Sequence, residues 1–296
     1  MRYESPIAFR QALEDRLANV SAESSIPLDR LRKLVAFDVF LRRLLIVEPD
    51  GWVLKGAVAL ALRSGIQSRF TRDIDLGRSG DEQDAIELVI AAQQVHLDDG
   101  FGFEAVKTVI PGDEQVLATV RFSVTAALAG RPFETFPLDI ALADPIGYEP
   151  DLVQTGDLLL FAGIEPVKVP AIRPTRHVAE KVHAMTRTYG PAASPSTRPK
   201  DLIDILLIES AEKLEADELR FDLRAVFETR GTHPLPRSLP EVPDDWTKPF
   251  ARLADEVGIR IDVDEGARRA RLLVDPVLQG SATGRWHPDR VEWTAD

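Results

Sequence analysis

Apolar residues follow a helical period near the start of this chain and a strand period in its middle. Ser5-Pro6 is a typical helix start, and the pattern behind it predicts a helix to about Val20. A second helix is predicted to follow Pro27 and to continue through Leu45. A third helical pattern covers residues 81–97.

The middle of the chain carries the alternation that is typical of strands. Residues 101–110, 116–128 and 134–142 are predicted to form a strand-rich meander, with turn residues at 129–132. One face of the second predicted strand is formed by Val116, Ala118, Val120, Phe122 and Val124. Residues 143–172 contain only short apolar pieces, and we predict irregular structure there.

After Arg173-Pro174 the period becomes helical again. Helices are predicted over 178–187, over 200–210 after a Pro-rich loop, and near 260–274 after a second Pro-rich connector at 233–249. The tail from Gly280 is interpreted as a loosely structured arm that docks Trp286 and Trp293 on the protein. A partner-binding surface is the alternative interpretation of these two tryptophans.

The most informative segment combines a strand, a glycine turn, a helix and a pair of aspartates. Residues 52–54 are apolar, Gly56 permits a tight turn, and 58–63 fit a short helix. Asp73 and Asp75 are separated by one residue and so project from the same face of an extended segment. Two adjacent carboxylates repel each other unless a cation lies between them, and Mg²⁺ prefers such oxygen ligands. A solvated turn or edge strand is the alternative.

A third carboxylate stands on the last strand of the predicted meander. Phe136, Leu138 and Ile140 form its apolar face, and Asp139 lies on the other face. A lone charge within so apolar a run is costly unless it is paired or bound to a metal. The pattern therefore favours Asp139 as a third metal ligand, with an ordinary polar-face aspartate as the alternative.

Composition removes several classes of function. The chain has 296 residues, 44% of them hydrophobic and 28% charged, as in ordinary globular proteins. No apolar run approaches the about 20 residues that span a bilayer, and the N-terminus lacks the apolar core of a signal peptide. The absence of cysteine excludes disulfides, thiol catalysis and thiolate zinc sites. These features predict a cytoplasmic protein with no membrane partner.

The charge distribution is more informative than its sum. A net charge of −12 argues against a generic nucleic-acid binder, because phosphate contacts need Lys and Arg. Residues 173–200, however, contain six basic residues and one acid, Glu180. The six are Arg173, Arg176, Lys181, Arg187, Arg198 and Lys200. A basic band inside an acidic protein predicts one defined contact with a polyanion.

Two further motifs complete a family resemblance. Residues 178–187 contain Glu180-Lys181 followed by Ala184, and 198–204 read Arg-Pro-Lys-Asp-Leu-Ile-Asp. With the Lys55-Gly56 turn, the aspartate pair and the later strand acid, these motifs resemble those of the AbiEii/MenT nucleotidyltransferase toxins. That family belongs to type IV toxin–antitoxin and abortive-infection systems. The motifs occur in the family's order over residues 50–210, and such an ordered set is specific where each motif alone is weak.

The resemblance implies an α+β, bilobed protein. Residues 1–172 would form a lobe with the mixed sheet of DNA-polymerase-β-type nucleotidyltransferases, and 173–296 a helical lobe. The implied activity is Mg²⁺-dependent transfer of a nucleotide, often a pyrimidine, from an NTP to an RNA 3′ end. The tRNA acceptor stem is the implied target, and its modification would block translation. The implied protein partner is a cognate antitoxin, either of helix-turn-helix type or kinase-like.

The resemblance also assigns roles to residues. Asp73 and Asp75 would hold two Mg²⁺ ions, and Lys55 would lie beside them. Lys181 would reach the nucleotide phosphates, and Asp201 would close the site from the helical lobe. The full set of expected site residues is Lys55, Gly56, Ala57, Asp73, Asp75, Asp139, Lys181 and Asp201, with Arg187, Arg198 and Lys200 guiding the RNA backbone. Simpler alternatives are a Lys181 on a solvated helix face and an Asp201 that caps its helix, with Asp204 bracing a lysine.

Three positions qualify the resemblance. Ala57 stands where the family has a second glycine, and Val58 where a small hydroxyl residue is common, so nucleotide binding is expected to be altered. Thr71 lies where some relatives carry a hydroxyl that is phosphorylated to silence the enzyme, and an ordinary β-branched strand residue is the alternative.

Two other functions fit parts of the pattern. A small-molecule nucleotidyltransferase of the aminoglycoside-modifying kind would suit an acidic cleft and a cationic substrate. A catalytically degenerate interaction protein would account for Ala57 and Val58. The intact set of Asp73, Asp75 and Asp139 argues against this second alternative, because abandoned metal ligands tend to be replaced.

Overall fold

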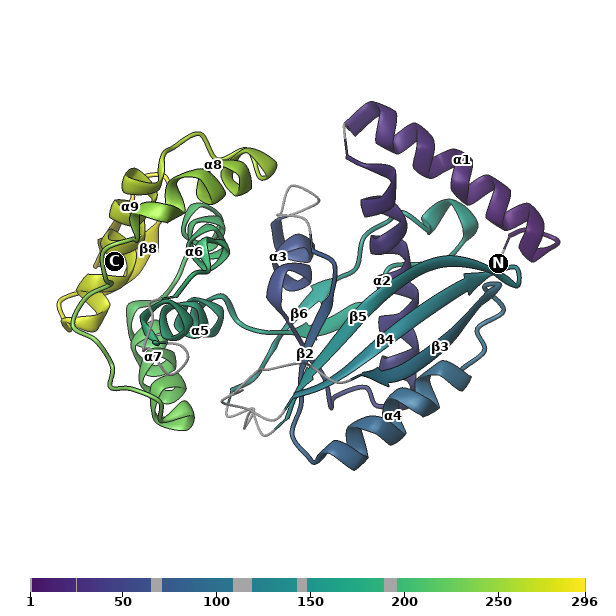
Figure 1. Cartoon of the computed structure of the whole chain (residues 1–296), viewed down its shortest axis with the longest axis horizontal. Coiled ribbons are helices and arrows are strands. Elements are labelled where there is room, and N and C mark those ends of the chain that lie inside the picture. Colours follow the sequence, from purple (N-terminus) through teal and green to yellow (C-terminus); the bar gives the residue numbers. More distant parts are fainter. Residues whose placement is uncertain are drawn as a thin grey trace. The chain divides into compact units, whose positions relative to one another are not determined.

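The computed structural model describes residues 2–24, 26–64, 71–108, 119–142, 148–188 and 196–295 (Figure 1). They form two compact units, the first within Met1–Arg63 and Phe70–Ala171 and the second within Ile172–Asp296. The first unit combines helices with a mixed sheet, and the second is mainly helical. The α+β class predicted from the sequence is confirmed. The predicted strand residues 109–110 and 116–118 and loop residues 190–195 lie outside the described part of the chain.

Within the described residues, a seven-stranded mixed sheet forms the frame of the first unit. Its strands are β1 (Val53–Lys55), β2 (Ile74–Gly77), β3 (Phe101–Thr108), β4 (Thr119–Leu128), β5 (Arg131–Ala141), β6 (Asp151–Gln154) and β7 (Lys168–Ala171). Their order across the sheet is β3-β4-β5-β2-β1-β7-β6. The β2–β5 and β1–β7 pairs are parallel, and the other neighbours are antiparallel. Strand β2, which follows the glycine turn, is therefore flanked by β1 and β5.

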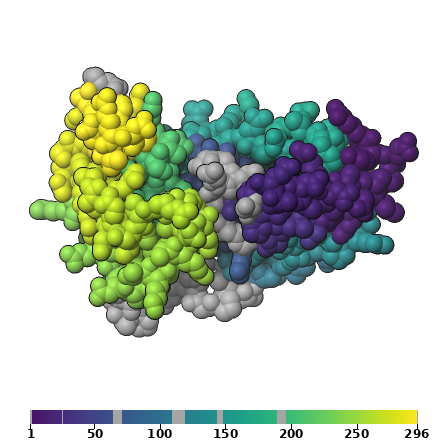
Figure 2. All heavy atoms as spheres, turned by 90° about the horizontal axis from the view of Figure 1, so that it is seen from above, coloured from purple at the N-terminus to yellow at the C-terminus, as the bar shows by residue number. Residues whose placement is uncertain are grey.

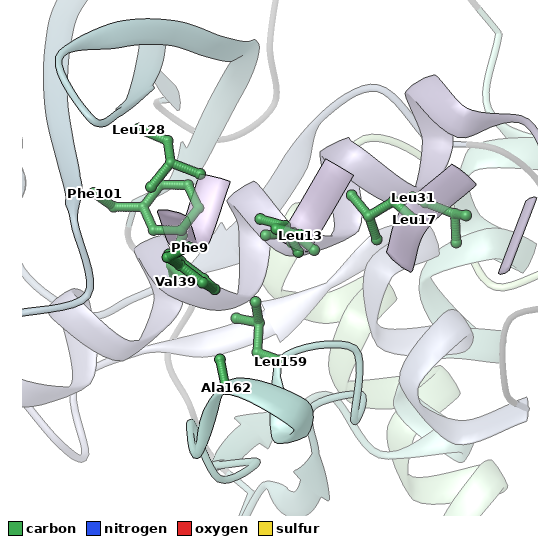
Figure 3. Close-up of a cluster of buried hydrophobic side chains, with 10 residues drawn as sticks. Phe9, Leu13, Leu17, Leu31, Val39, Phe101, Leu128, Leu159 and Ala162 are labelled. Carbon is green, nitrogen blue, oxygen red and sulfur yellow. The ribbon is translucent and has the colours of Figure 1, made fainter. Parts of the chain in front are cut away.

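Helices α1 (Pro6–Ser24) and α2 (Leu28–Val47) build a core against this sheet. Figure 3 shows the cluster, in which α1 and α2 side chains meet residues of the sheet and of the turn at Leu160–Ala162. Its labelled members are Phe9, Leu13, Leu17, Leu31, Val39, Phe101, Leu128, Leu159 and Ala162. Further along α2, Phe37 packs edge-on against Phe136 of β5, with ring centroids 5.0 Å apart. This contact anchors the strand that carries Asp139.

Two shorter helices connect the strands around the site. Helix α3 (Gly56–Ser64) follows β1 directly, and α4 (Glu82–Gln94) follows β2. The start of α4 is fixed by a capping box, because Asp81 accepts a hydrogen bond from the Asp84 amide and Asp84 accepts one from the Asp81 amide. The N-terminal helices are drawn in purple in Figure 2. Ile7 of α1 is exposed, as single apolar residues often are.

The second unit consists of α5 (Pro174–Thr186), α6 (Pro199–Ala211), α7 (Ala216–Arg230), α8 (Thr247–Glu256) and α9 (Val263–Leu278), with a hairpin of β8 (Arg285–His287) and β9 (Glu292–Thr294). The hairpin shows that the tail is ordered and not a loosely structured arm. Docking of its tryptophans is confirmed: Trp286 is fully buried and donates to the Glu209 carbonyl, and Trp293 donates to the Leu273 carbonyl. Among the described helices, none combines the length and apolar character needed to cross a membrane.

Residues 143–172 were predicted to be irregular, and this prediction is wrong for β6 and β7. Strand β7 is only four residues long, and its Val169 and Ala171 are buried beside β1. A strand this short shows too little alternation to be recognised from its own sequence. Helix α7 was also missed, although Leu219, Leu223 and Val226 share one buried face at helical spacing.

Candidate active site

Three aspartate side chains converge where β2 lies between its two neighbours. Asp75 lies in β2, and Asp139 is its register partner on the parallel strand β5. Asp73 directly precedes β2. One carboxylate oxygen from each of the three lies within 4.8 Å of the other two, and all three residues are partly exposed. The structure thus brings together the three carboxylates that the sequence pattern singled out; we call them the aspartate triad.

Asp73 lies before strand β2, so the alternation of side chains along a strand does not explain why its carboxylate points into the triad. Strand β2 begins at Ile74, so Asp73 and Thr71 lie in the bend before it and the strand does not extend back to Thr71. The Thr71 hydroxyl donates to Oδ1 of Asp73 at 2.7 Å. Ile74 and Leu76 are buried, as the alternation predicted. A hydrogen bond within the bend therefore helps to aim the first carboxylate.

The side chain of Asp75 leaves no room for a Cβ atom at residue 56, so this position needs a glycine. Its φ of +60° lies in the left-handed region, and a Cβ atom built there would be 1.9 Å from Oδ2 of Asp75. The preceding residue, Lys55, is the antiparallel register partner of Asp75, and it is buried. Cross-strand partners bring their Cβ atoms to about 5 Å, so the turn places a lysine beside the triad.

Ala57 and Val58, the two departures from the family pattern, are both buried in the first turn of α3. Their side chains contribute to the core, which gives them a packing role in this chain. The change from glycine to Ala57 therefore adds a methyl group to a filled interior rather than to an open surface.

Arg121 is a site residue that the sequence did not reveal. It lies on β4 as the register partner of Asp139, and its Nε donates to Oδ1 of that carboxylate at 2.6 Å. A second guanidinium nitrogen donates to Oδ2, so the contact is bidentate. This hydrogen bonding, together with the charges of the triad, raises the pKa of Arg121 against the lowering effect of burial. The register of β4 on β5, which sequence alternation does not fix, creates the pair.

In the second unit, Lys181 of α5 lies between two aspartates of α6. Its Nζ is 3.0 Å from Oδ1 of Asp201 and 2.8 Å from Oδ2 of Asp204. The Lys181 side chain is only 12% exposed and both aspartates are fully buried, so the alternative of a lysine on a solvated face is wrong. Bracing of Lys181 by Asp204 is confirmed. Asp201 also pairs with Arg198, at 3.2 Å.

The basic band of the sequence is largely balanced in space. Arg173 pairs with the buried Asp222 at 3.1 Å, and Arg176 is itself buried. Their charges are therefore directed into the second unit and do not form part of a continuous basic surface. A sum of charges over residues 173–200 leaves out Asp201, Asp204 and Asp222, which come later in the chain.

Other members of the band line cavities of the second unit. Arg198 and Lys200 face a cavity of about 350 Å³ together with Arg252 of α8, which the sequence gave no reason to include. Arg187 lines a second cavity of about 310 Å³. Trp246 contributes to the walls of both. Folding thus replaces the linear band with a cluster of cations from α6 and α8.

A comparison with family models decides the identity of the protein. The model of "Nucleotidyl transferase AbiEii toxin, Type IV TA system" matches residues 39–269, a span that contains the aspartate triad, Lys55 and the Lys181 cluster. The chain belongs to the AbiEii family. The family predicted from the sequence motifs is confirmed, and this AbiEii protein is a nucleotidyltransferase toxin. Membership of a type IV system implies a nucleotide substrate and an antitoxin partner.

The solved structure of MenT4 agrees with this assignment at the level of the fold. MenT4, the nucleotidyltransferase toxin Rv2826c from Mycobacterium tuberculosis H37Rv, is 20% identical with a TM-score of 0.56, over 90% of the AbiEii chain and 98% of MenT4. JHP933 from Helicobacter pylori is 16% identical with a TM-score of 0.43, over 84% and 93% of the two chains. No curated protein matches the sequence.

Proposed function

We propose that this AbiEii toxin transfers a nucleoside monophosphate from an NTP to the 3′-hydroxyl of an RNA. The observation that carries the proposal is the aspartate triad, with carboxylate oxygens from three separate positions within 4.8 Å of one another. The tRNA acceptor stem as target and a pyrimidine NTP as donor are part of the proposal, and they rest on the family resemblance. Modification of the acceptor end would stop aminoacylation and translation.

The residues of the triad fit Mg²⁺ as the metal. They offer only carboxylate oxygens, which hard divalent cations prefer, and their close approach is costly without a balancing cation. Asp73, Asp75 and Asp139 would hold two Mg²⁺ ions. When bound, Mg²⁺ lowers the pKa of the attacking hydroxyl and stabilises negative charge on the departing pyrophosphate.

The transfer itself is an exchange of two bonds at the α-phosphorus. The RNA 3′-oxygen forms a bond to that phosphorus, and the bond to the oxygen that bridges to the β-phosphate breaks. Pyrophosphate leaves with the electron pair, and the hydroxyl proton passes to solvent. Lys55, beside Asp75, would balance the negative charge of the triphosphate.

The direct test incubates the purified toxin with total tRNA and each labelled NTP, in Mg²⁺ or in EDTA. We expect RNA to be labelled by one NTP or by the two pyrimidine NTPs, and only in Mg²⁺. In a parallel incubation with an aminoglycoside in place of tRNA, labelling of that compound together with no labelling of RNA would favour the small-molecule alternative. Failure of the folded toxin to label any acceptor would favour a degenerate interaction protein.

The cations of α6 and α8 are proposed to hold the RNA backbone. Changing Lys200 and Arg252 to glutamine removes two of them and leaves the Arg198–Asp201 pair in place. We expect weaker tRNA binding with a shallower salt dependence, the slope of log K against log salt falling by about 0.9 for each lost contact to duplex phosphate. Filter binding at several salt concentrations measures this slope.

A matched control changes Arg260 and Arg290, two exposed residues of the same unit, to glutamine. It removes the same charge from elsewhere on the surface, and we expect a salt slope close to that of the wild type. Equal slopes for the two double variants would show that the RNA contacts another part of the protein.

Thr71 is proposed as the regulatory residue. Phosphorylation would break its hydrogen bond to Asp73 and place about two negative charges beside the triad, where the triphosphate is expected to bind. We therefore expect Thr71→Glu to be inactive. Thr71→Val loses only the hydrogen bond and should retain activity, reduced by about tenfold, because bonds to charged groups contribute roughly 1.5 kcal/mol or more.

Intact-mass and peptide mass measurements after co-expression with the antitoxin test this assignment. The expected result is one added phosphate on Thr71 and none on the Thr71→Val variant, which should escape inhibition. Neutralisation without added mass, or with the phosphate on another residue, would show that Thr71 is not the switch.

A further inference from the structure

The carboxylate of Asp139 is already engaged by a cation of the protein itself. Arg121 donates to both of its oxygens, in the planar, forked geometry that matches a carboxylate most closely. Asp139 is also one of the three carboxylates proposed to hold Mg²⁺. One side chain thus faces two competing partners, a guanidinium and a divalent cation.

A second arginine–aspartate pair in the same unit shows what a purely structural pair looks like. The Arg43 side chain is completely buried, contacts both oxygens of Asp99, and also donates to three backbone carbonyls, those of Val39, Val95 and Phe101. Its release would leave a buried charge without partners. The Arg121 side chain is 35% exposed, so its guanidinium can exchange Asp139 for water without disturbing the core.

The surroundings of Arg121 also differ from those of Arg43. The charges of Asp73 and Asp75, in addition to that of Asp139, act on the guanidinium. A positive charge at this position reduces the mutual repulsion of three clustered carboxylates. The same positive charge repels a divalent cation that approaches them.

We propose that Arg121 is a positioning residue that holds Asp139 ready and competes with the divalent metal for it. This inference rests on the proposed function, because it takes the triad as the metal site. Before substrate binds, the ion pair neutralises part of the triad and keeps its affinity for free metal low. Metal that arrives together with an NTP brings phosphate oxygens as additional ligands and as new partners for the released guanidinium. The site therefore favours the metal–nucleotide complex over the free metal.

The test measures binding of Mn²⁺ alone, by electron paramagnetic resonance, to the folded protein without NTP or RNA. Arg121→Gln removes the competing charge, and we expect Mn²⁺ to bind about tenfold more tightly than to the wild type. Arg121→Lys keeps the charge and should stay within about threefold of the wild type. Arg32→Gln is the matched control: its side chain is 36% exposed, it pairs with Glu14, and its loss should leave Mn²⁺ binding unchanged.

A double variant locates the competition at Asp139. In an Asp139→Asn background, Arg121→Gln should change Mn²⁺ affinity by clearly less than the about tenfold expected in the native protein, because the contested ligand is gone and only the repulsion by the guanidinium charge is removed. Unchanged or weaker Mn²⁺ binding by Arg121→Gln in the otherwise native protein would overturn the inference.

Failure of the proposed function gives a different result. If Asp73→Asn binds Mn²⁺ as tightly as the wild type, the metal lies elsewhere. If Arg121→Gln binds Mn²⁺ more tightly but the wild-type protein labels no RNA, the inference about Arg121 stands and the proposed reaction is wrong.

Discussion

Replacing Asp73 by asparagine is expected to abolish nucleotide transfer and the growth inhibition that depends on it. The change keeps the size of the side chain and removes its charge from a triad whose oxygens lie within 4.8 Å of one another. Asparagine can still accept the Thr71 hydrogen bond, so the bend before β2 is expected to persist. We expect a loss of at least about 1,000-fold, roughly 4 kcal/mol of transition-state stabilisation.

Transfer of label to RNA measures this effect, and circular dichroism with thermal unfolding shows whether the variant is folded. Asp50→Asn is the matched control, because Asp50 is exposed in the bend before β1 of the same unit. Asp139→Asn is expected to be nearly as severe as Asp73→Asn. Full activity of folded Asp73→Asn would remove Asp73 from the metal site, and a mild effect of Asp139→Asn would make Asp139 an ordinary polar-face residue.

The part of the site that could be predicted from the sequence is the part encoded by short-range spacing. A glycine after a short strand, followed by a helix and an aspartate pair, specifies a local path for the chain, and the described residues follow it in β1, α3 and β2. The alternation along β5 placed Asp139 on the face of the strand opposite to its apolar neighbours. Because β2 and β5 are adjacent, these local faces become one cluster of carboxylates.

The part that could not be predicted depends on which distant segments pair. Arg121 meets Asp139 only because of the register between β4 and β5. The sequence allows β4 to be recognised as a strand with Arg121 on its polar face, but a register shift of two residues would keep that face and move Arg121 away from Asp139. Strand β7 escaped prediction for a related reason, since its four residues are specified by pairing with β1 and β6.

Charge counting along the chain had the same weakness. The sum of charges over 173–200 is strongly basic because the acids that balance the band lie later in the sequence. Asp201 and Asp204 surround Lys181, and Asp222 holds Arg173. Conversely, Arg252 joins Arg198 and Lys200 at a cavity although it lies more than fifty residues further along the chain. An argument about a polyanion-binding surface therefore needs the fold before the residues can be chosen.

The conformation of Gly56 gives the second large effect that we expect. Gly56→Ala places a methyl group 1.9 Å from Oδ2 of Asp75, far inside van der Waals contact, in a backbone with φ +60°. The Asp75 carboxylate must move to relieve this clash, and misplacement of a catalytic group by about 1 Å costs on the order of 100-fold in rate. We expect a loss of at least that size in nucleotide transfer, together with weaker Mn²⁺ binding.

Gly130→Ala separates this clash from backbone strain. Gly130 lies in the turn between β4 and β5 with φ +71°, and a Cβ atom there would have no neighbour within 4 Å. Both substitutions force alanine into the left-handed region, at a cost of roughly 1–2 kcal/mol in the free energy of unfolding. Only Gly56→Ala displaces a carboxylate of the triad, so only it should lose transfer at a temperature where both variants are folded. Equal activity of the two variants would show that the Asp75 side chain is not held against Gly56, and the close fit of the glycine turn to the triad would have no catalytic role.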